Sequence, residues 1–309
     1  MAKGFHFFSV PVRPVLRNFF LASILLACLL GSIFKAEARE VTPFNNGWEF
    51  KKGPFPTDAM QTAARWNADW EQVNVPHTWN ADDMQKKTNS FYAGVAYYRK
   101  HYVFPESLEG KRLFLRFEGV GACAEVYVNG YLVGTHKGAY SAFVCEIGSQ
   151  VRLGEENEIV VKSDNVARPD VIPVNHALFG VYGGIYRPVW LIVTEPCNIV
   201  VNDCASPGVY ITQKNVSKQS ADVSVRVKLD NATLAPAALE LENAIYTREG
   251  KLVKVHRQFF ELTPQGVQNY VSDFKISHPH LWQGREDPYL YKVVSRLKQD
   301  GQVIDEVIQ

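Results

Sequence analysis

The sequence predicts an all-β protein that contains two β-sandwiches. Three observations support this fold class: apolar and polar residues alternate along several short segments, Gly-containing turn pairs separate these segments, and helical periodicity is confined to residues 58–66. Alternation with a period of two places every second side chain on the same face of a strand. Short strands with closely spaced turn signals are typical of β-sandwiches.

Length and composition limit the protein classes that remain. The 309 residues suggest about two domains at roughly 150 residues each. An apolar share of 46% and a charged share of 21% are those of a globular chain. The net charge of +1 gives no reason to expect nucleic acid as a partner, since nucleic-acid binding needs a basic surface. A (β/α)8 barrel needs about 250 residues, so it cannot fit in this sequence beside another domain.

Residues 1–38 are predicted to form a secretory signal peptide. Basic residues precede the apolar run Phe19–Phe34, and Ala36 and Ala38 make an A-x-A cleavage pattern. The run is shorter than the roughly 20 residues of a membrane span, although a retained anchor helix is the alternative. We therefore expect cleavage after Ala38, export to the periplasm or the extracellular space, and no membrane attachment afterwards.

The first sandwich is expected over residues 39–195. The segment Arg112–Glu118 alternates apolar and polar side chains, as an amphipathic strand does. Asn129-Gly130 lies between two further alternating runs and predicts a hairpin, because both residues tolerate a positive φ. The apolar strand Pro188–Thr194 ends this sandwich, just before the boundary expected at Glu195-Pro196.

The second sandwich is expected over residues 196–309, close to the roughly 100 residues of an immunoglobulin-like domain. Val223–Leu229 alternates with period two. Asp300-Gly301 predicts a hairpin that joins a strand over Tyr289–Gln299 to one over Gln302–Ile308.

Four cysteines follow the signal peptide, and no CxxC pair occurs among them. An exported chain can form disulfides, and four cysteines allow three pairings between which the sequence does not choose. Buried free thiols are the alternative. The four residues are Cys123, Cys145, Cys197 and Cys204.

Several local patterns are interpreted as structural. Gly119–Ala124 fits the GxGxx[GA] dinucleotide fingerprint, but the fingerprint needs a helix after it and Ala124–Val128 continues as a strand. His278-Pro279-His280 has no further metal ligands nearby and is expected to form a turn. Asp82-Asp83 and Glu155-Glu156 are interpreted as solvated loop charges. We therefore expect no cofactor and no metal.

Two loop segments are candidates for binding: Val75–Asp82 combines aromatic, amide and carboxylate groups, and Asn175–Arg187 offers two tyrosines beside Gly183-Gly184, which allows close backbone approach. Sugars require this combination, because their C–H faces stack on aromatic rings and their hydroxyls need polar partners. For Trp79 and Tyr186 individually, packing in the core is the favoured alternative. The candidate carbohydrate-binding residues are Trp79, Asn80, Asp82, Asn175, His176 and Tyr182.

The chain resembles the N-terminal half of a glycoside hydrolase family 2 enzyme, the group of β-galactosidases, β-glucuronidases and β-mannosidases. Many separate pieces occur in the expected order, and the glycine-rich one is the most specific. They are Gly47-Trp48, Val75–Asn80, Val95–Arg99, Val126–Gly130, Gly183–Arg187, Val189–Leu191, Pro279–Trp282, Asp287–Tyr291 and Asp300-Gly301.

The resemblance implies a jelly-roll sugar-binding domain, an immunoglobulin-like domain and then a catalytic (β/α)8 barrel with two glutamates that act by a retaining mechanism. Gln309 lies about where the barrel would begin, so both glutamates are expected to lie outside this sequence and the chain alone is expected to be inactive. The family commonly has an Asp six residues before the second glycine of the glycine-rich piece. Here Leu178 occupies that position, with Asn175 and His176 as nearby substitutes.

The expected function is that of the non-catalytic N-terminal portion of a β-galactosidase-like glycosidase, with a β-linked carbohydrate as partner. One alternative is an exported, stand-alone carbohydrate-binding module. Another is an interaction module that pairs with a separately encoded barrel or with further copies of itself, because an immunoglobulin-like domain without its barrel should expose an apolar face.

Overall fold

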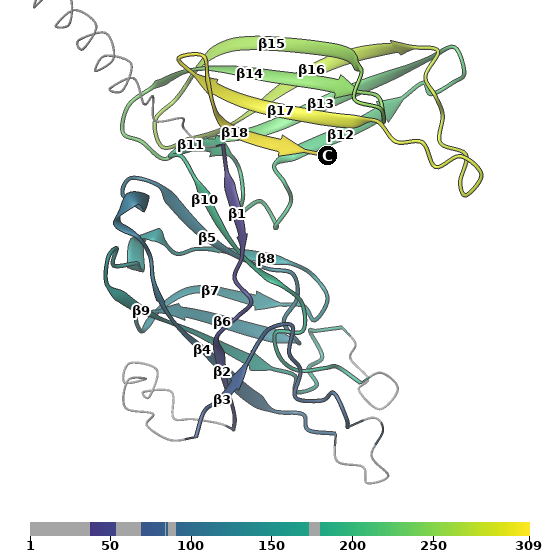
Figure 1. The fold of residues 1–309 in the computed structure, drawn as a ribbon. Helices are drawn as coiled ribbons and strands as arrows, with labels where there is room; N and C mark the ends of the chain where they lie inside the picture. The colour runs from purple at the N-terminus through teal and green to yellow at the C-terminus, as the bar shows by residue number, and fades with distance from the viewer. Residues whose placement is uncertain (1–37, 54–68, 84, 86–90, 173–179) are drawn as a thin grey trace, which may run out of the picture. The chain divides into compact units, whose positions relative to one another are not determined.

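The computed structural model describes residues 38–53, 69–83, 85, 91–172 and 180–309 (Figure 1). The chain divides into two compact units, residues 1–36 and 37–309, and all described residues belong to the second unit. The predicted signal peptide, apart from Ala38, and the predicted helix over residues 58–66 lie outside the described residues.

The first sandwich consists of two antiparallel sheets (Figure 1). The four-stranded sheet has the order β1-β10-β5-β8, formed by Glu40–Pro43, Val189–Thr194, Arg112–Phe117 and Phe143–Glu146. The six-stranded sheet has the order β3-β2-β4-β9-β6-β7, formed by Glu71–Val73, Trp48–Lys52, Val95–Val103, Glu156–Asp164, Cys123–Val128 and Tyr131–Lys137. The 3₁₀ helices η2 (Glu106–Leu108) and η3 (Gly148–Gln150) lie in connections.

The core of the first sandwich is formed by the inward-facing residues of these strands. On β5, Leu113, Leu115 and Phe117 face this core, whereas Phe114 on the opposite face packs against Val201 from the start of the second sandwich. Phe114 thus interrupts the predicted alternation of apolar and polar residues, and both faces of β5 are apolar because this strand is covered on both sides.

The second sandwich also has two antiparallel sheets. In the first, the long strand β13 (Ser220–Asn231) pairs with β16 (Gly266–Ser277) along one edge, and with β12 (Val209–Lys214) and β11 (Cys197–Ile199) along the other. The second sheet has the order β15-β14-β17-β18, formed by Leu252–Leu262, Ala237–Tyr246, Lys292–Gln299 and Gln302–Ile308.

The structure confirms the all-β fold and both predicted hairpins. Asn129 and Gly130 have φ values of 51° and 84° between β6 and β7, and Asp300 and Gly301 have φ values of 50° and 77° between β17 and β18. The strand predicted over Tyr289–Gln299 was too long at its start. It begins at Lys292, because the Tyr289 ring stacks on His280 at a centroid distance of 3.9 Å and is part of the preceding loop.

Free thiols are found at all four of the cysteines that the structure describes, Cys123, Cys145, Cys197 and Cys204. Cys145 and Cys197 are buried, Cys123 is half-buried and Cys204 is exposed, so the alternative of buried thiols applies fully to two of the four. Burial raises the pKa of the Cys145 thiol to about 12. This thiol therefore stays protonated and unreactive at neutral pH.

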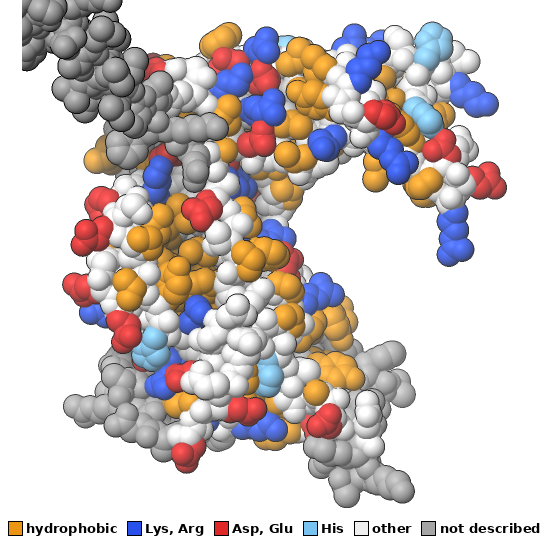
Figure 2. Space-filling view, in the orientation of Figure 1, with side chains coloured by type: hydrophobic (Ala, Val, Ile, Leu, Met, Phe, Trp, Pro, Cys, Tyr) orange, Lys and Arg blue, Asp and Glu red, His pale blue; other side chains and the backbone are white. Residues whose placement is uncertain are grey.

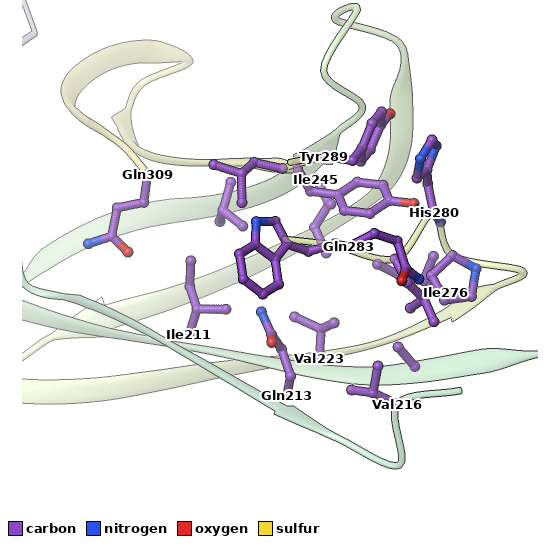
Figure 3. Close-up of a pocket in the computed structure, with 17 residues that line it drawn as sticks. Ile211, Gln213, Val216, Val223, Ile245, Ile276, His280, Gln283, Tyr289 and Gln309 are labelled. Carbon is purple, nitrogen blue, oxygen red and sulfur yellow. Dashed lines mark hydrogen bonds between the residues drawn. The ribbon is translucent and has the colours of Figure 1, made fainter. Parts of the chain in front are cut away.

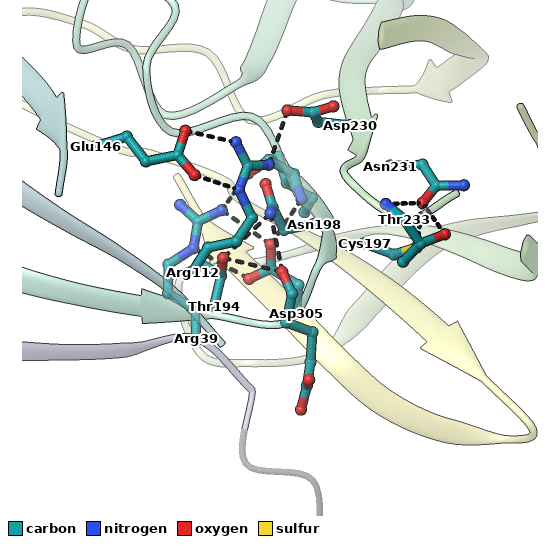
Figure 4. Close-up of polar contacts among 12 residues, drawn as sticks. Arg39, Arg112, Glu146, Thr194, Cys197, Asn198, Asp230, Asn231, Thr233 and Asp305 are labelled. Carbon is teal, nitrogen blue, oxygen red and sulfur yellow. Dashed lines mark hydrogen bonds and ion pairs between the residues drawn. The ribbon is translucent and has the colours of Figure 1, made fainter. Parts of the chain in front are cut away.

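Ion pairs join strands of the two sandwiches (Figure 4). The Arg39 guanidinium donates to both carboxylate oxygens of Asp305, with Nε–Oδ1 and Nη2–Oδ2 distances of 3.0 and 2.9 Å. Asp305 also accepts the backbone N–H of Ile199 at 2.7 Å. Nearby, Arg112 on β5 donates to Glu146 on β8 and to Asp230 on β13. The Arg39–Asp305 pair thus connects the residue before β1 to β18, and the Arg112–Asp230 pair connects β5 to β13.

A second ionic network covers the outer face of the β15-β14-β17-β18 sheet, where Figure 2 shows basic and acidic side chains intermixed. At its centre, the buried Glu242 accepts hydrogen bonds from Arg257, Arg296 and Lys298 at 2.7 to 3.2 Å. Burial alone would raise the pKa of the Glu242 carboxyl, but these three cations outweigh it and lower that pKa to about 2.

We expect this network to make stability depend on pH. The folded-state pKa of Glu242 lies below its unfolded value of 4.5. Its stabilising contribution is therefore complete above about pH 4.5 and is lost as the pH falls toward 2. At about 1.4 kcal/mol per pKa unit, it amounts to about 3 kcal/mol. The free energy of unfolding, measured from pH 7 to 2.5, should fall less steeply in Glu242→Gln than in the wild type.

Glu261→Gln is the matched control, because Glu261 is an exposed carboxylate on the neighbouring strand β15. This variant should reproduce the wild-type pH profile. Equal acid sensitivity of Glu242→Gln and the wild type would contradict the assignment of the effect to Glu242.

Candidate functional site

A glycine-rich segment around Gly183-Gly184 packs closely against the first sandwich. Gly184 forms an antiparallel bridge with Gly121, and a Cβ atom on Gly121 would lie 2.0 Å from the Tyr182 carbonyl oxygen. A Cβ atom on Gly183 would lie 1.8 Å from the Trp79 indole. The glycines are therefore required for close backbone approach. Since β6 follows this connection directly, the GxGxx[GA] pattern has the structural role that was predicted.

Two buried asparagines fix this segment in place. Asn80 Oδ1 accepts the Gly183 N–H at 2.8 Å and the Asn165 side-chain amide at 3.2 Å. Asn165 in turn donates to the Val181 carbonyl at 2.8 Å and accepts the Gly94 N–H at 2.8 Å. Both asparagines are fully buried. The amide groups of Asn80 and Asn165 thus satisfy backbone groups that would otherwise be buried without partners.

A histidine and a tyrosine support the other end of the segment. The backbone N–H of His77 donates to the Ile185 carbonyl at 2.8 Å. The ring nitrogen Nδ1 of His77 shares a hydrogen bond with the Tyr98 hydroxyl at 2.7 Å. Burial is the main cause that lowers the pKa of His77 and raises the pKa of Tyr98. Both side chains are therefore neutral at pH 7 and act as hydrogen-bonding supports.

Four of the six candidate carbohydrate-binding residues lie within the described part of the chain. Trp79 is buried at 7% exposure in the core, where its Nε1–H donates to the Tyr92 carbonyl, and Asn80 is fully buried. Asp82 is exposed, and Tyr182 is 42% exposed. Trp79 therefore packs in the core, which was the alternative to a contact with sugar. The remaining candidates, Asn175 and His176, and the substituted position Leu178, lie outside the described residues.

Sequence reasoning missed Phe91, which lies beside Tyr182 with a ring-centroid distance of 6.5 Å. It also misinterpreted Asp83 as a solvated loop charge. The Asp83 carboxylate accepts the Asn80 amide at 2.7 Å and the Tyr92 N–H at 3.2 Å, so it anchors the loop. The three-residue spacing from Asn80 was the available signal, because such side chains meet readily in a turn.

Tyr186 also has a structural role. Its hydroxyl donates to the Ala139 carbonyl, and the Arg187 guanidinium lies 5.6 Å from the centre of its ring. The half-buried Tyr186 ring is thus held by a contact to the loop after β7. This agrees with packing in the core, the alternative to a contact with sugar.

The three buried carboxylates of the described residues, Asp164, Glu242 and Asp305, are each paired with cations. Retaining glycosidases need two carboxyl groups about 5–5.5 Å apart across the glycosidic bond. These buried acids instead bind cations: Asp164 with Arg168, Glu242 with Arg257, Arg296 and Lys298, and Asp305 with Arg39.

The His278-Pro279-His280 segment is a structural turn, as predicted. His280 Nε2 lies 2.5 Å from an Asp287 carboxylate oxygen, and its ring is stacked on Tyr289. In the described part of the chain, no group of three or more His, Cys, Asp or Glu side chains is arranged to hold a metal ion. Within the same residues, no helix has the length and hydrophobicity needed to cross a membrane.

Two antiparallel sandwiches in sequence, the first with the exposed Tyr182 beside a fixed glycine-rich segment, define a two-domain all-β protein. Two family models match them: "Glycosyl hydrolases family 2, sugar binding domain" over residues 42–196 and "Glycosyl hydrolases family 2" over residues 207–309. The chain belongs to glycosyl hydrolase family 2, with a sugar-binding domain followed by an immunoglobulin-like domain.

Relatives within this family are considerably longer. A β-glucuronidase from Bacteroides fragilis is 36% identical over 93% of this chain and 39% of its own length. A β-galactosidase from Thermoanaerobacter pseudethanolicus is 29% identical over 86% of this chain and 34% of its own length. The chain thus spans less than half of these relatives.

Solved structures show the same fold. A candidate β-galactosidase from Bacteroides fragilis superposes with a TM-score of 0.84 at 70% identity, over 88% of this chain and 41% of that one. A β-glucuronidase from Bacteroides uniformis gives a TM-score of 0.82 at 29% identity, over 87% and 32%.

Proposed function

We propose that this chain is the non-catalytic, substrate-positioning portion of a β-galactosidase-like or β-glucuronidase-like glycosidase and that its partner is a β-linked carbohydrate. The names of the relatives support this class of substrate. In this proposal the two catalytic glutamates belong to a barrel domain, which either continues this chain or is encoded separately.

The observation on which the proposal depends is the way Tyr182 is presented. Asn80 and Asn165 hold the backbone on both sides of it, through Gly183 N–H and the Val181 carbonyl. The Tyr182 side chain remains 42% exposed beside Phe91. A ring held in this way offers an apolar face to a pyranose at little conformational cost, because its backbone is already ordered.

We assign the chemical step to the barrel domain because the buried acids of the described residues are paired with cations. Asp305 and Glu242 are each hydrogen-bonded to at least one cation. For Glu242, the neighbouring cations lower the pKa to about 2, so this carboxylate is a poor general acid. We therefore expect the described sandwiches to bind and orient a sugar without cleaving it.

The test is an assay with nitrophenyl β-galactoside and nitrophenyl β-glucuronide, combined with calorimetry. The purified chain should release no nitrophenol above the buffer blank, and Tyr182→Ala should weaken the binding of a methyl β-glycoside by about fivefold or more. Tyr131→Ala is the control, because Tyr131 is 63% exposed on β7 of the same sandwich. Turnover that is lost on mutation of one carboxylate of this chain would refute the proposal.

We also propose that the chain is exported and that its mature form begins at Arg39. The ion pair between Arg39 and the buried Asp305 supports this site, because it includes residue 39 in the folded structure. Amino-terminal sequencing of the exported protein tests it, and a sequence that begins at Met1 would contradict it.

A further inference from the structure

The second sandwich contains a hollow of about 430 Å³, lined by residues of β12, β13, β16 and the loop over residues 278–291 (Figure 3). Its walls include apolar side chains of the sandwich core, among them Val223, Ile276 and Val293. The volume is within the usual range of small-molecule sites, about 300–1,000 Å³. The hollow is separate from the Tyr182 site, which lies in the first sandwich.

Polar groups surround this apolar hollow. The exposed side chains of Gln213, Gln283 and Gln309 line it from three separate segments (Figure 3). Trp282 also lines the hollow and is 64% exposed. The Tyr291 hydroxyl accepts the His280 N–H at 2.8 Å, which leaves its own proton available as a donor.

The lining also restricts the charge of a ligand. It contains no Asp, Glu, Lys or Arg, and its histidine, His280, is paired with Asp287. A charged ligand would lose its hydration here without gaining an opposite charge. The hollow therefore favours an uncharged ligand.

We propose that this hollow is a binding site for a neutral saccharide. An exposed indole offers a face to the C–H groups of a pyranose, and amides from several directions pair with its hydroxyls. An apolar protein segment fits this lining less well, because it would cover the three glutamine amides without giving them partners. The site goes beyond the proposed function, since it lies in the immunoglobulin-like domain and selects against uronates.

The experiment is a titration of the purified chain with methyl β-galactoside, methyl β-glucoside, methyl β-mannoside and sodium glucuronate, followed by saturation-transfer NMR and calorimetry. We expect at least one neutral glycoside to bind with a dissociation constant of about 1 mM, and glucuronate to bind at this site at least about tenfold more weakly. Absence of binding by every neutral glycoside up to about 20 mM would overturn the proposal.

Variants assign the binding to the hollow. Trp282→Ala and Gln213→Ala should each weaken the binding of the neutral glycoside by about fivefold or more. Phe259→Ala is the matched control and should leave it unchanged, because Phe259 is an exposed aromatic residue on β15, at 78% exposure, outside the hollow. Unchanged binding in Trp282→Ala would overturn the proposal.

Two further outcomes separate this proposal from the proposed function. Binding that is lost in Tyr182→Ala and retained in Trp282→Ala would support the first-sandwich site alone and overturn this one. Self-association through Trp282 without any sugar binding would also overturn it, and would indicate that the hollow is a protein-docking surface.

Discussion

Gly184→Ala should destabilise the first sandwich by about 3–4 kcal/mol. Gly184 has a φ of 110°, which L side chains rarely adopt, and its Cβ atom would lie 2.3 Å from the Tyr98 hydroxyl and 2.7 Å from the His77 carbonyl oxygen. The His77 oxygen belongs to the backbone and cannot rotate away. Guanidinium unfolding followed by tryptophan fluorescence is the measurement, because Trp282 is the only tryptophan after residue 195.

Gly110→Ala separates the two causes of this effect. Gly110, also in the first sandwich, has a positive φ, 76°, but no atom lies within 4 Å of the Cβ position. Its substitution should cost only the conformational term, about 1–2 kcal/mol. If Gly184→Ala costs no more than Gly110→Ala, close packing against Tyr98 and His77 is not what requires the glycine.

The effect of Gly184→Ala extends to the candidate site. The same short segment contains Gly183, whose N–H is bound by Asn80, and Tyr182, whose ring is exposed. Movement of the backbone at Gly184 should therefore displace Tyr182 from Phe91. A variant that remains folded should bind methyl β-glycosides more weakly than the wild type.

The hairpins could be predicted from the sequence because their cause is local. Asn129-Gly130 and Asp300-Gly301 adopt positive φ values by their own chemistry, whereas the register shifts within both hairpins were not predicted. The strand β13 could also be predicted, because its alternation of valine with polar residues directly reflects one buried face.

The candidate site could be predicted only in part because its cause is non-local. Asn80 meets Asn165 across 85 positions of sequence and Gly183 across 103. Nothing near Asn80 indicates that its amide is consumed by backbone groups. Trp79 illustrates the same limit: aromatic residues serve both sugar stacking and core packing, and the missing side chain of Gly183 decides between them.

Asp305→Ala should have a comparably large effect, about 3–5 kcal/mol. The Asp305 carboxylate is fully buried and accepts hydrogen bonds from Arg39 and from the Ile199 backbone. Removing it leaves the Arg39 guanidinium, whose side chain is only 10% exposed, without its counter-charge. Chemical unfolding followed by circular dichroism measures this loss. A change below about 1 kcal/mol would mean that Arg39 finds water or another partner.

Two further variants show why burial decides the size of this effect. The double substitution of Arg39→Met with Asp305→Leu should be more stable than Asp305→Ala alone, because it removes the unpaired charge along with its partner.

Glu155→Ala breaks the ion pair with Arg152, in which both side chains are more than half exposed. It should cost less than about 0.5 kcal/mol, since water replaces an exposed pair at little cost. Equal losses in Glu155→Ala and Asp305→Ala would contradict a special role for the buried pair that joins β18 to the residue before β1.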